Sequence, residues 1–217
     1  YALYPPLGLM HLAAAVDQSG HSADIFDLEI ETVGFDEVCR QITDSGTDII
    51  GITATTPVYH LAQAYAAGFR QKLGLPIIIG GPHITVMGQE EFSSEFDFAV
   101  IQEGEETLVD LLNALENNGD LREVRGLLYR DGNEVITTTP RPFLKNLDEL
   151  PIPARNKVDP LNYIFEVAGK GVIPVGTIEL TRGCPFKCVF CSEPLNTGRS
   201  LRKRSPKSVV DEMLAVK

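Results

Sequence analysis

Residues 47–56 read TDIIGITATT, a β-branched run of the kind that is buried on both faces of a parallel sheet. The next segment, HLAQAYAAGFRQKLG at 60–74, has the apolar spacing of a helix and ends at a glycine. A second strand-like run, LPIIIGG, follows at 75–81. A strand, a helix and a strand in this order predict a right-handed crossover, the unit from which open parallel sheets are built.

The same alternation continues on both sides of this unit. Upstream, we expect helices over 6–20 and 35–46, with an alternating strand over 21–30 that ends near Leu28. Downstream, we expect a strand over 97–102 and a helix over 105–119. The pattern predicts an α/β fold with a doubly wound parallel sheet of the flavodoxin-like or Rossmann-like kind.

The character of the sequence changes after residue 121. Residues 122–139 contain two strand-like runs around an Asp131-Gly132 turn, which predicts a hairpin. The proline-punctuated stretch at 140–160 reads as a linker. A new β-branched strand is expected over 175–184, and a helix over 205–217 that begins at a serine followed by a proline.

We therefore divide the chain into three parts: a doubly wound domain at 1–139, a linker at 140–170 and the start of a second domain at 171–217. The sequence opens without a methionine and stops inside the last expected helix. We expect a fragment of a longer protein, in which the first strand of the doubly wound domain is missing.

Composition narrows the class of protein. The chain has 217 residues, 43% of them hydrophobic, and a formal net charge of −11, which opposes non-specific binding to nucleic acid. It contains no apolar run near the ~20 residues of a membrane span and no signal peptide pattern, so we expect a cytoplasmic protein. One stretch is locally basic, and we expect a solvated loop there, with the alternative that Arg202 and Arg204 face a carboxylate or phosphate. Its basic residues are Arg199, Arg202, Lys203, Arg204 and Lys207.

The carboxyl edge of the expected sheet is the first candidate site, because ligands of open parallel sheets bind beyond the ends of the strands. Glycines there let a backbone approach a bulky or phosphorylated group, and hydroxyls supply hydrogen bonds. The alternative is that the paired glycines only form a turn and that His83 is a satisfied loop histidine; we do not expect it to bind metal. The candidate residues are Thr53, Thr55, Thr56, Gly80, Gly81, Pro82, His83, Glu103, Gly104 and Glu105.

The second candidate site is TRGCPFKCVFCSEP at 181–194, where Cys184, Cys188 and Cys191 have the spacing C-x3-C-x2-C. A disulfide is a poor interpretation of three thiols in a reducing compartment, and structural zinc lacks a fourth ligand nearby. Three thiolates on one loop suit a four-iron cluster in which one iron stays open. Cys39 lies on an expected helix and is interpreted as a small core residue.

These cysteines, with Phe190 directly before the last one and a strand ending in TRG before the first, resemble the motif of the radical S-adenosylmethionine enzymes. The resemblance implies a 4Fe-4S cluster on Cys184, Cys188 and Cys191 and a partial (β/α) barrel of the TIM type that begins with these residues. In that family S-adenosylmethionine chelates the open iron and yields a 5′-deoxyadenosyl radical. It also implies a small-molecule substrate and a reducing partner such as flavodoxin or ferredoxin.

The upstream segments are similar to the cobalamin-binding subclass of this family. They read YPPLGLMHLAAAV, IGITATTPVY, IIIGGPHIT, VIQEGEETL and LDELPIPA. The resemblance implies that the candidate residues of the sheet edge line a corrinoid pocket. Since YPPLG stands where better-known corrinoid folds carry Asp-x-His-x-x-Gly, it also implies cobalt without a protein histidine ligand.

The function implied is methyl transfer to an unactivated carbon, or a related radical rearrangement or cyclisation, by a longer chain; the fragment itself is not expected to turn over. We assign no catalytic residue. The alternatives are a non-catalytic corrinoid or iron–sulfur protein that acts as a sensor or electron carrier, and a docking scaffold with an empty edge. A tRNA methylthiotransferase is a weaker alternative, because only Cys39 is available for a second cluster.

Overall fold

The computed structural model describes residues 3–30, 33–169 and 171–215. They form two compact units, each described by itself. The sheet unit comprises Val33–Phe143 and Gly183–Arg199, and the α1–α7 unit comprises the rest. The units are not continuous in sequence, and the domain boundaries predicted at 139 and 170 stay predictions.

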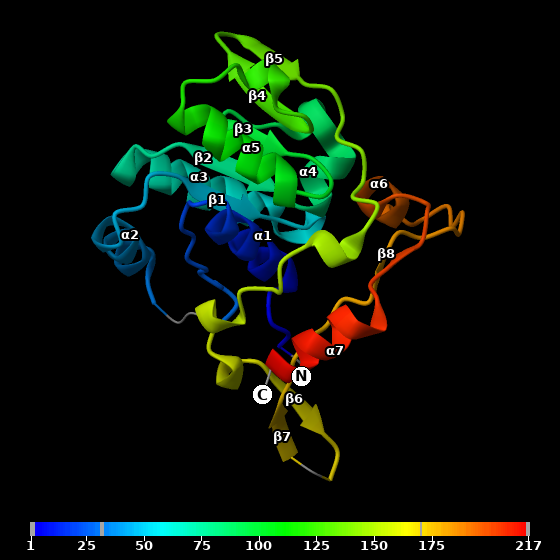
Figure 1. Ribbon diagram of the computed structural model, residues 1–217. Coiled ribbons are helices and arrows are strands. Elements are labelled where there is room, and N and C mark those ends of the chain that lie inside the picture. The colour runs from blue at the N-terminus through cyan, green and yellow to red at the C-terminus, as the bar shows by residue number, and fades with distance from the viewer. Residues whose placement is uncertain (1–2, 31–32, 170, 216–217) are drawn as a thin grey trace. The chain divides into compact units, whose positions relative to one another are not determined.

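The sheet unit contains a five-stranded sheet with the order β1-β2-β3-β4-β5 (Figure 1). The first three strands run parallel, and the last two form an antiparallel hairpin that continues the same sheet. The parallel α/β core and the hairpin were both predicted, and the fold class is confirmed. The strands are β1 Ile50–Thr53, β2 Ile77–Gly80, β3 Phe98–Val100, β4 Leu127–Asp131 and β5 Glu134–Thr137.

Helices connect and cover these strands. The helix after β1 ends at Gly74, whose φ of 66° is the left-handed conformation that commonly closes a helix. The helix after β3 begins with two glutamates, which its amino-terminal dipole favours. The helices of the sheet unit are α2 Phe35–Asp44, α3 Tyr59–Leu73, α4 Pro82–Met87, α5 Glu105–Glu116 and α6 Glu193–Thr197.

Both faces of β2 are buried. Ile78 packs with Phe98, Val100 and Leu111 in a cluster that joins α5 to one face of the sheet, and Figure 1 shows α5 lying across the strands. Ile77 and Ile79 have no exposed surface and, because side chains alternate along a strand, lie on the opposite face. The isoleucine run of β2 is therefore covered on both sides. The burial on both faces that the sequence predicted for residues 47–56 is wrong for β1, an edge strand of the described sheet in which Gly51 and Thr53 are exposed and Ile52 is half-buried.

The α1–α7 unit is built mainly from short elements. Its secondary structure comprises α1 Leu7–Gln18, the hairpin β6 Ile164–Val167 with β7 Gly171–Pro174, the short pair β8 Thr181–Arg182 with β9 Arg202–Lys203, and α7 Pro206–Ala215. Its small apolar core packs Ala13 and Ala14 of α1 against Ala154. The backbone N–H of Ala154 also donates to the carbonyl of Met10, 3.0 Å away. The proline-rich segment is therefore anchored on α1.

Two predicted strands are wrong in the described residues. Residues 21–27 are irregular and 28–30 form a turn. Their amides use side chains instead of a neighbouring strand, since Ala23 donates to Asp17 and Glu29 donates to Asp27. The strand expected over 175–184 shrinks to Thr181–Arg182, the only residues there that pair with β9. Residues rich in β-branched side chains do not form a strand without a partner.

The solvated loop expected for the basic stretch is partly confirmed, because Arg199, Lys203 and Lys207 are exposed. It is wrong for Arg202 and Arg204. The Arg202 side chain donates to the carbonyl of Leu144, and the Arg204 side chain is only 5% exposed and pairs with the carboxylate of Glu212. Cys39, by contrast, is buried as predicted, and burial raises the pKa of its thiol. Among the described residues, no helix is both long and apolar enough to cross a membrane.

Candidate functional site

The ends of β1 and β2 are joined at the carboxyl edge of the sheet. Thr53 and Gly80 are partners in the parallel register, and the amide of Ala54 donates to the Gly80 carbonyl at 3.2 Å. The amide of His83 then donates to the Ala54 carbonyl, also at 3.2 Å. The segments that follow β1 and β2, called their exits below, are therefore hydrogen-bonded to each other, as expected for neighbouring parallel strands.

The local structure requires a glycine at position 81. Its φ is +96°, and a Cβ there would lie 2.5 Å from the Thr53 hydroxyl oxygen and 3.0 Å from the Ala54 carbonyl. The close approach of the two exits requires a glycine at this position. Gly80 differs, because the nearest atom to an added Cβ is the Val100 carbonyl oxygen at 3.8 Å. The turn therefore explains the glycine at position 81. It does not explain the glycine at position 80, which stays a candidate ligand-binding residue.

His83 is buried beneath this edge. Its side chain is stacked near Tyr59, with 3.9 Å between ring centroids, and its Nδ1 lies 3.1 Å from the Thr56 hydroxyl. Its Nε2 is buried and has no hydrogen-bond partner among the described atoms. A buried polar atom without a partner costs about 1–3 kcal/mol, so a water molecule or a ligand group that bonded this nitrogen would stabilise the site. Burial also raises the pKa of Tyr59.

The remaining residues predicted at the edge differ in exposure. The three threonine hydroxyls and Pro82 are on exposed residues, whereas Glu103 and Gly104 are half-buried and Glu105 is buried at the start of α5. Since β1, β2 and β3 are neighbours in the sheet, their exits lie along one edge. The structure therefore brings the predicted edge residues together, while their contacts with a ligand stay a prediction.

The cysteine loop, residues 183–199, belongs to the sheet unit. The amide of Cys184 donates to the Gly198 carbonyl at 2.9 Å, which closes the loop at its base, and the amide of Cys191 donates to Cys188 at 3.3 Å. Cys188 and Cys191 are exposed, Cys184 is half-buried, and all three are free thiols. In the part of the chain that the structure describes, no three potential ligands are gathered closely enough to hold a metal. The cluster ligands stay a prediction.

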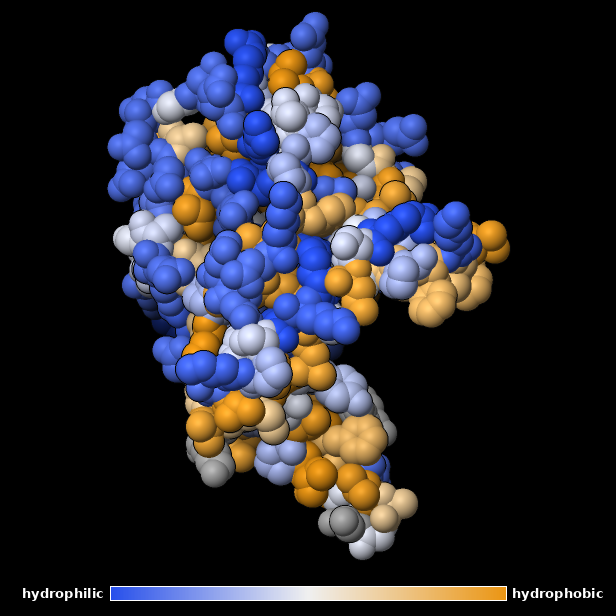
Figure 2. Space-filling view, turned by 45° about the vertical axis from the view of Figure 1, so that its right-hand side comes forward, coloured by the Kyte–Doolittle hydropathy of each residue, from blue (hydrophilic) through white to orange (hydrophobic). Residues whose placement is uncertain are grey.

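The tip of the cysteine loop is apolar. Phe186 is 70% exposed, Phe190 is 89% exposed and Val189 is fully exposed. Figure 2 shows hydrophobic surface gathered on this loop and on the β6–β7 hairpin. Large exposed apolar patches of this kind mark surfaces that contact another group or another protein segment.

Three contacts attach the cysteine loop to the rest of the sheet unit. α6 packs against α4, the helix that begins directly after Gly81. Gly198 lies against the ring of Phe143, so closely that a Cβ would be 2.8 Å from it. Gln102, the second residue after β3, donates its side-chain amide to the Leu195 carbonyl at 3.2 Å. Sequence reasoning missed Gln102; its place directly after a strand was the available signal.

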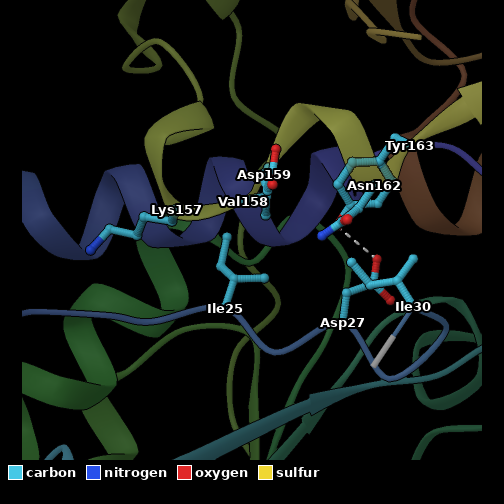
Figure 3. Close-up of a pocket in the computed structure, with 8 residues that line it drawn as sticks. All are labelled: Ile25, Asp27, Ile30, Lys157, Val158, Asp159, Asn162 and Tyr163. Carbon is cyan, nitrogen blue, oxygen red and sulfur yellow. Dashed lines mark hydrogen bonds between the residues drawn. The ribbon is translucent and has the colours of Figure 1, made fainter. Parts of the chain in front are cut away.

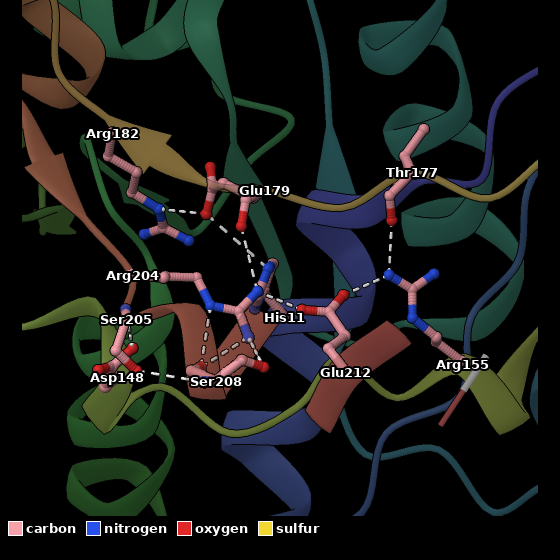
Figure 4. Close-up of polar contacts among 10 residues, drawn as sticks. All are labelled: His11, Asp148, Arg155, Thr177, Glu179, Arg182, Arg204, Ser205, Ser208 and Glu212. Carbon is pink, nitrogen blue, oxygen red and sulfur yellow. Dashed lines mark hydrogen bonds and ion pairs between the residues drawn. The ribbon is translucent and has the colours of Figure 1, made fainter. Parts of the chain in front are cut away.

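Buried charges gather in the α1–α7 unit (Figure 4). Glu212 of α7 has no exposed surface and forms ion pairs with both Arg155 and Arg204. Arg182 pairs with Glu179 at 2.7 Å, and His11 of α1 lies 3.9 Å from the same carboxylate. These pairs hold α7 to the proline-rich segment and fix the residues that lead into the cysteine loop.

A small pocket of about 170 Å³ also lies within this unit (Figure 3). Three of its polar side chains already have partners: the Tyr163 hydroxyl donates to Asp27 at 3.0 Å, and Lys157 pairs with Asp17 at 3.0 Å. Ile25 and Ile30 supply apolar lining.

Comparison with known proteins bears directly on the sheet edge. The family model described as the B12 binding domain matches residues 1–112, just over half of the chain. The chain belongs to the B12-binding domain family. The match includes the three parallel strands, the glycine pair and His83. The predicted resemblance to cobalamin-binding radical S-adenosylmethionine proteins is confirmed at the level of family and fold.

Curated relatives of this B12-binding chain are longer proteins. An uncharacterized methyltransferase, PH0819, from Pyrococcus horikoshii is 34% identical over 212 residues, covering 96% of this chain and 45% of the relative. An anaerobic magnesium-protoporphyrin IX monomethyl ester cyclase from Cereibacter sphaeroides is 31% identical, covering 97% of this chain and 35% of the relative. The chain spans less than half the length of either relative.

Solved structures share the fold of this B12-binding chain. The radical S-adenosylmethionine methyltransferase TsrM from Kitasatospora setae matches with a TM-score of 0.79 and 22% identity, over 100% of this chain and 44% of its own. The cobalamin-dependent S-adenosylmethionine radical enzyme OxsB matches with a TM-score of 0.75 and 21% identity, over 97% of this chain and 29% of its own. The match to TsrM includes the cysteine loop, since it covers the whole of this chain.

Proposed function

We propose that this chain is part of a cobalamin-dependent radical S-adenosylmethionine enzyme that transfers a methyl group to an unactivated carbon, or performs a related radical rearrangement or cyclisation. One observation carries the proposal: the cysteine loop lies in the same compact unit as the sheet edge of the B12-binding fold, where Gln102 and α4 contact α6. This arrangement supports a protein that holds two cofactors on one unit.

The sheet edge fits a corrinoid. Corrinoid side chains carry amides and a phosphate, which need hydrogen-bond donors and acceptors, and three exposed residues there, Thr53, Thr55 and Thr56, carry hydroxyls. Gly80 leaves room for a close approach of the backbone. The unpartnered Nε2 of His83 provides one further polar atom beneath the edge. These residues would hold and orient the cofactor.

The thiols of the cysteine loop are suitable ligands for an iron–sulfur cluster. Cys184, Cys188 and Cys191 are free thiols on one loop, the ligand type that iron–sulfur clusters take. When bound, the cluster would supply an open iron for S-adenosylmethionine and the electron that cleaves it. Phe190 and its apolar neighbours would exclude water from that position. The protein's own task is to hold and orient the two cofactors.

A cytoplasmic location, a small-molecule substrate and a reducing partner such as flavodoxin or ferredoxin complete the proposal. The printed names of relatives include a hopanoid C-3 methylase and a cytidylyl-2-hydroxyethylphosphonate methyltransferase. Because these named substrates are chemically unrelated, we propose a reaction class for this chain and no particular substrate. The residues that determine substrate specificity therefore have to be identified in the full-length protein.

The test is anaerobic reconstitution of the full-length protein with iron, sulfide and hydroxocobalamin, followed by desalting and assay of all three elements. We expect about four irons and one cobalt per chain, and reductive cleavage of S-adenosylmethionine to 5′-deoxyadenosine or methyl transfer. Iron without cobalt would overturn the cofactor assigned to the sheet edge. Both cofactors without any cleavage of S-adenosylmethionine would favour the sensor or electron carrier instead.

A further inference from the structure

One of the three contacts between the cysteine loop and the rest of the sheet unit comes from a side chain with an unusual backbone conformation. Gln102 has a φ of +67°, and of the described non-glycine residues only Asn118 shares a positive φ. A long side chain is disfavoured in this left-handed region, and such a residue persists where its surroundings hold it. Residues held in this way cluster at ligand sites and switch regions.

Two partners hold Gln102, and they come from different segments. Its backbone N–H donates to the Thr85 hydroxyl of α4 at 2.9 Å. Its side-chain amide donates to the Leu195 carbonyl of α6 at 3.2 Å. α4 and α6 are also packed against each other. Gln102 therefore lies where the exits of β2 and β3 meet the cysteine loop.

The neighbours of Gln102 in sequence are the edge residues assigned to the corrinoid. Glu103, Gly104 and Glu105 follow it directly, and α4 begins after Gly81. A corrinoid bound by these residues would contact the backbone on both sides of this junction. A change in the backbone at Gln102 moves the donor that reaches Leu195, which lies four residues after Cys191.

We propose that Gln102 is a positioning residue that couples occupancy of the sheet edge to the conformation of the cysteine loop. The proposal rests on the proposed function, because it needs cobalamin at the edge and a cluster on the loop. It predicts that each cofactor tightens the binding of the other, since coupling between two sites is reciprocal.

The experiment measures this coupling in anaerobic full-length protein. Hydroxocobalamin is titrated optically into protein with the reconstituted cluster and into protein stripped of iron, and the ratio of the two Kd values is the coupling factor. For the unaltered protein we expect cobalamin to bind at least about five-fold more tightly when the cluster is present, the lower end of typical coupling factors.

Two variants remove the contact in different ways. Gln102→Glu keeps the length of the side chain but replaces the donor by a carboxylate, which cannot donate to the Leu195 carbonyl. Gln102→Gly removes the side chain and relieves the left-handed backbone, so loss of folding does not obscure the result. Both should bring the coupling factor close to one. Gln102→Lys restores a donor and should keep most of the coupling.

The matched control is Gln71→Glu, which makes the same chemical change at an exposed position of α3. It should keep the coupling of the unaltered protein. Unaltered protein that binds both cofactors with a coupling factor of one would overturn the role of Gln102 and leave the proposed function standing. Coupling that survives in Gln102→Glu and Gln102→Gly would overturn it equally. Failure to bind cobalamin at all would overturn the proposed function and this inference together.

Discussion

At the scale of single residues, the two glycines at the sheet edge, Gly80 and Gly81, have different surroundings. Gly81 has a positive φ and faces the Thr53 hydroxyl, whereas a Cβ at Gly80 would make only ordinary contact with the Val100 carbonyl oxygen, 3.8 Å away. The two look equivalent in the sequence. Their different surroundings make them a matched pair of positions for testing the geometry of the edge.

Gly81→Ala should destabilise the protein by about 2 kcal/mol or more, because a Cβ is disfavoured at a φ of +96° and would lie 2.5 Å from the Thr53 hydroxyl oxygen. Gly80→Ala should change the free energy of unfolding by less than about 1 kcal/mol. Urea unfolding of the two variants measures the difference. Equal effects would show that the exits of β1 and β2 are not packed as described.

The three loop cysteines and Cys39 form a second matched comparison. Alanine at Cys184, Cys188 or Cys191 should abolish the cluster, since each change removes one of three anchors. Cys39→Ala should leave iron and sulfide content unchanged, because that thiol is buried on α2. Iron and sulfide assays after reconstitution decide between them. Full iron content in any of the loop variants would contradict the assignment.

At the scale of elements, buried charge rather than apolar area anchors α7. The exposed residues of this helix include Val210, Met213 and Leu214, while its one fully buried side chain is Glu212. That carboxylate is paired with two arginines from outside the helix. Burying a carboxylate is costly unless it is paired, so the position of α7 depends on this contact.

Glu212→Ala should therefore destabilise the protein by about 3–5 kcal/mol, because it leaves Arg155 and Arg204 buried without their shared partner. Asp211→Ala is the control on the same helix: it removes an exposed pair with Lys207 and should cost less than about 1 kcal/mol. Chemical denaturation followed by circular dichroism gives both values. A small effect of Glu212→Ala would mean that the buried pairs do not hold α7.

At the scale of the whole molecule, the matches to longer proteins make cofactor binding the property to measure in the full-length chain. A ligand that binds only the folded state stabilises it by an amount set by its concentration and Kd. At 100 times the Kd this amount is about 2.7 kcal/mol. Stability is therefore a readout of cobalamin binding that does not require the substrate.

Hydroxocobalamin should raise the thermal unfolding midpoint of the unaltered full-length protein in a concentration-dependent way. In the Gly81→Ala variant the midpoint should start lower and rise less, because the altered edge binds the corrinoid more weakly. Thermal melts followed across a cobalamin titration measure both effects. A midpoint that does not respond to cobalamin in the unaltered protein would contradict binding at this edge.

Local patterns in the sequence were enough to predict much of the sheet unit. The apolar run at 75–81 predicted the strand β2, and the glycine at position 74 predicted the end of α3. The Asp131-Gly132 pair predicted the turn of the β4–β5 hairpin. These features depend on side-chain period and on the conformational preference of single residues, which neighbouring sequence determines.

Other features depend on partners that are distant in the sequence, and only the tertiary structure decided them. Residues 21–30 form no strand, because their amides are bonded by side chains. Arg204 is buried since it meets Glu212, and Gln102 reaches a carbonyl 93 positions away in the cysteine loop. The sequence by itself determined the family, the strands of the sheet unit, its longer helices α2, α3 and α5, and the candidate ligands, whereas the short helices α4 and α6 were not predicted. Tertiary structure decided which of them lie together, because hydrogen bonds and ion pairs between remote segments form only when the chain has folded.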